Sequence, residues 1–175
     1  IDELKESRNH LISQFSSGEI SESLHDDYTE ILDQYFRKSH EESKVGPTLH
    51  RTKKSFAFIA VGGYGRMELC LHSDIDIIIL FNGGIPSQAK DLIEETIYPL
   101  WDVGLDVGHG IRTIKDCITL SRDDFEVFTS MLNARFICGD SKLYLSLMKS
   151  LEKKVISKNA PRFGIWLEDE DRYRK

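Results

Sequence analysis

The chain has 175 residues, of which 40% are hydrophobic and 30% charged, the composition of a soluble globular protein with a substantial core. Its formal net charge of −6 disfavours a large contact with a phosphate backbone, so we expect no nucleic-acid partner. No apolar run approaches the length of a membrane span, and we expect no membrane partner either.

Three cysteines, Cys70, Cys117 and Cys138, are odd in number and lack the spacing of a zinc site. We therefore expect free thiols and a reducing, cytoplasmic location. The first residue is Ile rather than Met, from which we expect a fragment of a longer chain.

The N-terminal part predicts two helices. Hydrophobic residues recur every three or four positions over residues 20–36, after a break at residues 16–18, and a shorter helix over about residues 2–15 packs beside this one. Residues 43–54 contain Gly and Pro and predict a loop. The basic residues of that loop, which either approach phosphates or stay solvated, are Arg51, Lys53 and Lys54.

An apolar strand over residues 55–61 leads into the segment Gly62-Gly63-Tyr64-Gly65-Arg66. Glycines allow a sharp turn and let backbone N–H groups approach an anion closely. Arg66 offers a planar fork of donors that suits phosphate oxygens. The spacing matches neither a Walker loop nor G-x-G-x-x-G.

A second strand over residues 75–81 begins between Asp74 and Asp76. Positions i and i+2 of a strand face the same side, so the two carboxylates converge. Mg²⁺ prefers a few carboxylates together with substrate phosphates, and we expect it here. Each half alone also fits a tight hairpin and an ordinary edge strand, but the combination favours nucleotidyl transfer.

Further helices are expected after the second strand. One begins at Ser87, restarts or kinks at Pro99 and ends at Gly104. The pairs Thr113/Asp116 and Ser121/Asp124 resemble capping boxes. The second of these is expected to start a helix that carries Phe125, Phe128, Met131, Leu132 and Phe136.

Two helical segments are predicted near the end of the chain. Gly139 fits the position after a helix, and Asp140 caps the next helix, which extends to about Val155. A last amphipathic segment opens at Pro161.

These residues resemble the polymerase-β-type nucleotidyltransferase superfamily, in which a strand, a glycine turn and an S-D-x-D segment follow one another. Within it, the chain is similar to the nucleotidyltransferase domain of bacterial protein-PII uridylyltransferases, which act in nitrogen regulation. The similar segments are residues 60–80, 97–104, 107–113, 132–135 and 139–140.

The resemblance implies an Mg²⁺-dependent enzyme that transfers UMP from UTP to a tyrosine of the PII signal protein and releases pyrophosphate. Gly62, Gly63 and Arg66 would hold the triphosphate, and Ser73 would fix the loop. Asp74 and Asp76 would be the catalytic metal ligands. No residue indicates uracil rather than adenine as the base, so the expectation of UTP follows from the resemblance alone. The alternatives are a related enzyme acting on another protein or a small molecule, and a catalytically impaired nucleotide-binding regulator.

Many superfamily members carry a third carboxylate on a later strand, whereas the expected strand over residues 105–113 has no acid in its middle. His109 is expected to act as a base or nucleotide contact, or else to make a structural hydrogen bond. Asp106 lies on the opposite face, where it completes the metal site or is only an exposed charge. Arg112 meets a phosphate or the acceptor, or forms a surface ion pair.

The expected fold is α+β, a polymerase-β-like core with a small mixed sheet flanked by helices. We divide it into an N-terminal helical extension at 1–50, the nucleotidyltransferase core at 51–122 and a C-terminal helical region at 123–175. These parts are expected to form one compact unit.

Overall fold

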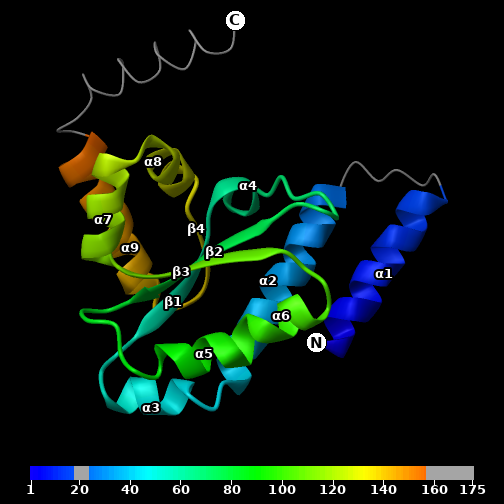
Figure 1. Cartoon of the computed structure of the whole chain (residues 1–175), viewed down its shortest axis with the longest axis horizontal. Helices are drawn as coiled ribbons and strands as arrows, with labels where there is room; N and C mark the ends of the chain where they lie inside the picture. The colour runs from blue at the N-terminus through cyan, green and yellow to red at the C-terminus, as the bar shows by residue number, and fades with distance from the viewer. Residues whose placement is uncertain (18–23, 157–175) are drawn as a thin grey trace, which may run out of the picture.

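A mixed sheet of four strands organises the molecule (Figure 1). The computed structural model describes residues 1–17 and 24–156. The strand order is β3-β2-β1-β4; β1 is antiparallel to β2 and β4, and β2 is parallel to β3. The α+β fold with a small mixed sheet is thus confirmed. The strands are β1 (Phe56–Ala60), β2 (Ile75–Phe81), β3 (Val107–Thr113) and β4 (Arg135–Gly139).

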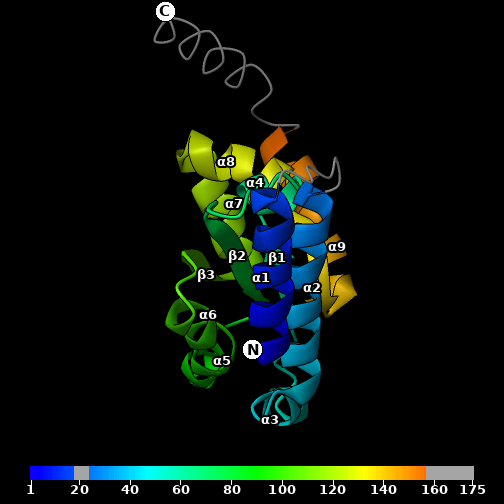
Figure 2. The same ribbon diagram turned by 90° about the vertical axis from the view of Figure 1, so that its right-hand side faces the viewer.

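Helices cover both faces of this sheet, each over its own hydrophobic core. Figure 2 shows the two long N-terminal helices side by side. The first face carries α1 (Asp2–Ser16), α2 (Leu24–Glu42), α3 (Gly46–Arg51), α5 (Ala89–Thr96) and α6 (Tyr98–Asp102). The second face carries α7 (Ile114–Asp123), α8 (Phe125–Leu132), α9 (Ser141–Leu151) and the π-helical turn η1 (Glu152–Ile156).

The central strand β2 contributes to both cores. Ile77 and Ile79 join the first core, and Ile78 and Leu80 join the second. This two-sided burial explains why the strand reads as a continuous apolar run rather than an alternating one. A slip by one residue would exchange the two faces and turn Asp76 toward the first core, which disfavours another register. Asp76 therefore faces the side of α7 and α8.

Two expectations about secondary structure, one before β1 and one at β4, were wrong. Residues 46–51 form the short helix α3 rather than a loop, because Pro47 suits a first helical turn and Leu49 is fully buried. The helix expected to reach Phe136 ends at Leu132, and Phe136 lies in β4. Pairing with β1 decides this, since tertiary contacts override the helical spacing of the aromatic residues.

The caps match the predictions in part. Thr113 and Asp116 form a reciprocal capping box, and Asp140 caps α9. Asp124 caps α8 by itself, whereas Ser121 is buried within α7. The residue before α5 is Gln88 rather than Ser87, and it makes no side-chain cap. Gly139 ends strand β4 and not a helix, and the segment expected after Pro161 lies outside the described residues.

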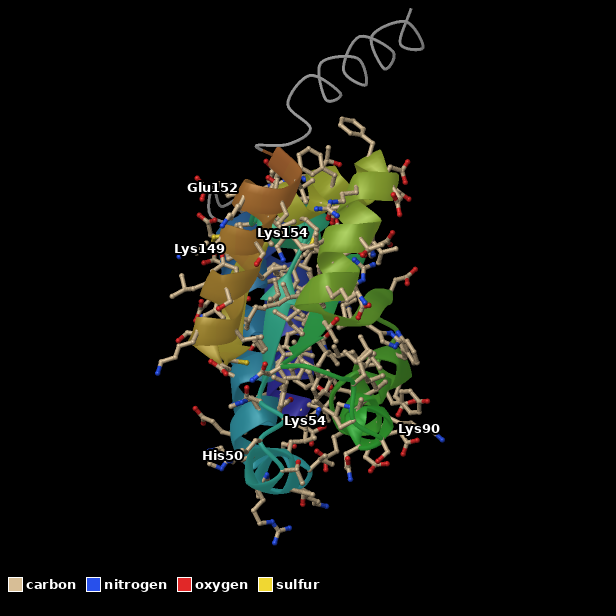
Figure 3. All side chains as sticks on the ribbon, turned by 90° about the vertical axis from the view of Figure 1, so that its left-hand side faces the viewer. His50, Lys54, Lys90, Lys149, Glu152 and Lys154 are labelled. Atoms are coloured by element: carbon tan, nitrogen blue, oxygen red, sulfur yellow. The ribbon has the colours of Figure 1, made fainter. Side chains whose placement is uncertain are left out.

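The basic segment before β1 lies far from the start of β2. Figure 3 shows His50 and Lys54 at the α3 end of the molecule, away from Lys154 and α8. Lys54 donates to the carbonyl of Gly84 at 3.2 Å. Phe56 pairs with Phe81, at the end of β2 opposite to Asp76, so this cluster stands apart from the acidic pair.

The cysteines agree with one further expectation. Cys70, Cys117 and Cys138 are free thiols. Burial raises the pKa of the Cys117 thiol to about 11 and that of Cys138 to about 12, so both stay protonated at neutral pH. Over the ranges 1–17 and 24–156, no helix has the length and apolarity needed to cross a membrane.

A buried polar cluster joins α2, β4 and the turn after β1. The carboxylate of Asp33, 2% exposed, accepts from the hydroxyl of Tyr64 at 2.7 Å and from both terminal nitrogens of Arg135. The guanidinium of Arg135 also lies 5.3 Å from the centre of the Tyr64 ring. Burial, followed by the charge of Asp33, raises the pKa of Tyr64 well above its ordinary value, so it remains a donor.

We predict that Asp33→Ala lowers the free energy of unfolding by about 3 kcal/mol, the lower end of the range for breaking a buried ion pair, because Arg135 keeps some solvent contact. Urea unfolding followed by circular dichroism measures this change. The matched control is Glu30→Ala, which removes an exposed ion pair from the same helix and should change stability little. Equal unfolding curves for Asp33→Ala and the parent would contradict the role given to the cluster.

Candidate active site

The glycine turn begins where β1 ends. Val61 is still extended, and α4 (Gly62–Gly65) then forms a single turn. Gly62 adopts φ +58, a conformation that favours glycine. A Cβ at Gly65 would lie 2.1 Å from the carbonyl oxygen of Asn133, so the turn packs directly on the chain after α8. Each of these glycines is needed for a specific backbone geometry.

Gly63 differs from its neighbours because a Cβ at this position would meet no atom within 4 Å. The space beside it is open, and its neighbour Gly62 borders the carboxylate of Asp76. Tyr64 follows directly and is buried in the cluster with Asp33 and Arg135. The turn therefore presents an open glycine on one side and is anchored to the core on the other.

The acidic pair lies at the start of β2, beside this turn. Asp74 is exposed just before the strand, and Asp76 is half-buried as its second residue. Burial, the charge of Asp74 and the charge of Asp106 together raise the pKa of Asp76. The charges of Asp74 and Asp106 thus both act on Asp76. Alternation along β2 predicted the convergence of Asp74 and Asp76, whereas the role of Asp106 was left open.

Two glycines enclose the carboxylate of Asp76. A Cβ at Gly62 would lie 3.1 Å from Oδ2, and a Cβ at Gly108 would lie 2.7 Å from Oδ1. Gly108 is the partner of Asp76 in the parallel pairing of β2 with β3. The carboxylate therefore occupies a slot that exists only because both neighbours lack a side chain. This role of Gly108 was not predicted, since it depends on the register between two distant strands.

The third strand separates the two candidates for a further catalytic group. Asp106 precedes β3, and its carbonyl accepts from the N–H of Ile75 at 2.9 Å, which holds it beside the start of β2. His109 pairs with Ile77, so its side chain is on the face opposite to Asp76. Its ring packs 5.4 Å from that of Trp101, and burial lowers its pKa. The structure brings Asp106, and not the ring of His109, to the side of the acidic pair.

Arg66 and Ser73 occupy the loop between α4 and β2. Arg66 is exposed and forms an ion pair with Glu68, with Nε 2.6 Å from Oε2. Its guanidinium thus has a partner in this structure and would have to exchange it to reach a phosphate. Ser73 accepts from the N–H of Cys70 at 3.0 Å and so closes the loop directly before Asp74.

The donor set fits a hard cation that is shared with a substrate. Among the described residues, no three His, Cys, Asp or Glu side chains form a group that could hold a metal alone. Mg²⁺ is commonly bound by one or two carboxylates and completed by water and phosphate oxygens. Burial and then the charges of Asp74 and Asp106 raise the pKa of Asp76, and a bound divalent cation would offset both effects.

A cleft of about 330 Å³ opens beside Asp76 on the side of α8. The glycines of β3 form part of its lining, and Arg112 lies along it. Arg112 was predicted to meet a phosphate, the acceptor or a surface partner; over residues 1–17 and 24–156 it forms no ion pair.

The sequence analysis did not predict the pair of Asp33 and Arg135 that anchors the turn. These residues are 102 positions apart, so no local pattern indicates their contact.

The turn, the acidic strand and the cleft are those of a nucleotidyltransferase, and the comparison with known proteins agrees. The family described as "Putative nucleotidyltransferase DUF294" matches residues 5–105, and the chain belongs to this family. The chain is also similar to the bifunctional uridylyltransferase/uridylyl-removing enzyme of Ruegeria pomeroyi, with 43% identity over 121 residues. The match covers 68% of this chain and 13% of that protein. The expected resemblance is thereby confirmed.

We predict that Gly63→Val leaves the fold unchanged but weakens triphosphate binding about tenfold, or about 1.4 kcal/mol. The added side chain projects into open space one residue after Gly62, which borders Asp76, and would obstruct a ligand rather than the protein. Calorimetric titration with a non-hydrolysable triphosphate and Mg²⁺ measures the affinity. Gly84→Val, at the other end of the sheet, is the control; a parental affinity for Gly63→Val would show that the phosphates bind elsewhere.

A second comparison separates Asp106 from His109. Because Asp106 is on the side of Asp76, Asp106→Asn should lower turnover at least about tenfold and raise the Mg²⁺ concentration needed. His109→Ala should have the smaller effect on turnover, since its ring packs on Trp101. Pyrophosphate release over an Mg²⁺ titration tests both variants. A larger loss for His109→Ala, at unchanged thermal stability, would return the catalytic role to the histidine.

Proposed function

We propose that this chain catalyses Mg²⁺-dependent transfer of UMP from UTP to a tyrosine of a PII-type signal protein, with release of pyrophosphate. The observation that carries the proposal is the carboxylate of Asp76, held between Gly62 and Gly108 beside Asp74. The choice of UTP is supported by the similarity to the uridylyltransferase of R. pomeroyi. The choice of PII is supported by the resemblance of residues 97–104 and 107–113 to the protein-PII uridylyltransferases. The full activity of that longer protein is not assumed for this chain.

In this mechanism, Asp74 and Asp76 hold the metal. When bound, Mg²⁺ neutralises charge on the phosphoryl oxygens and lowers the pKa of the attacking hydroxyl. Gly62 and Gly63 leave room for the phosphates next to the pair, and the anchored Tyr64 keeps the turn from moving away. Such fixed geometry lowers the barrier because less reorganisation is needed when the reaction occurs.

Asp106 supports an active enzyme over a binding module that has lost turnover. Its negative charge acts on Asp76, so a third carboxylate is available on that face although the middle of β3 has none. From there it would accept the proton of the attacking hydroxyl or complete the metal site. This third carboxylate supports the proposal of an active nucleotidyltransferase.

The proposal is tested by incubating the chain with each labelled nucleoside triphosphate and Mg²⁺, with and without PII. We expect label to appear on PII from UTP, and to be lost when the acceptor tyrosine of PII is replaced by phenylalanine. Label on PII from ATP but not UTP would contradict the base assignment. Labelling that does not depend on PII would contradict the acceptor.

We predict that Asp76→Asn lowers the rate of transfer by about 10² to 10³ or more, because it removes a charged metal ligand. Asp74→Asn should act in the same direction. Asp91→Asn, an exposed substitution on α5, is the control and should keep the parental rate. Turnover of Asp76→Asn at the parental rate, after removal of contaminating wild-type enzyme, would refute the two-carboxylate site.

A further inference from the structure

Two glycines of β3 form part of the floor of the cleft between β3 and α8. Gly108 and Gly110 are both on the face of Asp76, since they pair with Asp76 and Ile78 in the register of β2 and β3. Two residues of a strand span about 7 Å, so this part of the floor extends about that far along β3 from the carboxylate. The volume of the cleft, about 330 Å³, is within the range of small-molecule sites.

Arg112 lies along this floor. A Cβ at Gly110 would be 3.1 Å from its Nε, so the guanidinium extends back over the glycine toward Asp76. The acid nearest in sequence, Asp116, is already engaged by the N–H of Thr113 at 2.8 Å and by its hydroxyl at 2.7 Å. Within the described residues, Arg112 makes no ion pair, and its donors remain available to a ligand.

The opposite wall comes from α8, through Glu126, Val127 and Ser130. The cleft therefore combines a cationic donor, an anionic acceptor, a hydroxyl and an apolar side chain. Phosphate groups alone are a poor match for the far side of the cleft, because Glu126 would repel them. A planar neutral group that both donates and accepts hydrogen bonds fits this lining well.

We propose that this cleft binds the nucleoside of the triphosphate and that Arg112 and Glu126 read the edge of its base. The proposal rests on the proposed function, in which the phosphates lie toward Gly62 and Gly63, on the other side of Asp76. Arg112 donates to a carbonyl oxygen of the base, and Glu126 accepts from an N–H next to it. A base with a lactam edge, such as uracil, offers both groups, whereas the corresponding edge of adenine has an amino group and an unprotonated ring nitrogen.

The test compares the parent with Arg112→Met and Glu126→Gln. Calorimetry with Mg²⁺ measures the affinity for non-hydrolysable analogues of UTP and ATP and for inorganic tripolyphosphate. We expect Arg112→Met to weaken the UTP analogue about tenfold or more and leave tripolyphosphate unchanged, because only a base contact is lost. Glu126→Gln should lower the preference for the UTP over the ATP analogue. Arg51→Met, on α3 at the other end of the molecule, is the control.

Other results would overturn this assignment. An equal loss for tripolyphosphate would make Arg112 a phosphate ligand, and unchanged analogue affinities with a raised KM for the acceptor would make the cleft an acceptor site. Parental affinities and base preference in both variants would show that neither residue reads the base. A parent that binds no triphosphate would refute the proposed function and this inference together, whereas a parent that transfers UMP with unaffected variants would refute the inference alone.

Discussion

The buried carboxylate of Asp33 is the interaction on which the active-site geometry depends. It binds the hydroxyl of Tyr64 and the guanidinium of Arg135, so one group ties together a helix, the glycine turn and the edge strand β4. A charge removed from water is tolerated only when its hydrogen bonds are satisfied, which makes the cluster sensitive to the loss of any member. The same hydrogen bond from Tyr64 to Asp33 anchors α4, a four-residue turn that contains three glycines.

The candidate active site places an enclosed carboxylate next to open space. The carboxylate of Asp76 lies between Gly62 and Gly108, while the space beside Gly63 is open and a cleft borders β3. Rigid ligands next to open space suit a reaction in which substrate phosphates complete the coordination of a metal. The parallel pairing of β2 and β3 is essential, because it brings Gly108, rather than a bulky residue, against the carboxylate.

Local sequence patterns predicted much of the fold and part of the candidate site. The apolar run of β2, the carboxylates at its start and the capping box of Thr113 each follow from residues near one another in the chain. Features that depend on pairing between distant segments were not predicted. Phe136 follows the helical spacing of the preceding aromatic residues but lies in β4, and the contact of Asp33 with Arg135 joins residues far apart in the chain. Alternation along β3 predicted that Asp106 and His109 lie on opposite faces. Only the register between β2 and β3 shows which of these faces is the face of Asp76.

The glycine walls also limit the length of the acidic side chain that this site can use. Aspartate and glutamate carry the same charge, but the additional methylene of glutamate would move the carboxylate out of the slot between Gly62 and Gly108. In the proposed Mg²⁺ site, the charge of a displaced carboxylate would not compensate for its position, because Mg²⁺ tolerates little variation in the placement of its oxygen ligands. At position 76, chemical similarity is therefore insufficient, and the backbone of two neighbouring segments selects the shorter acid.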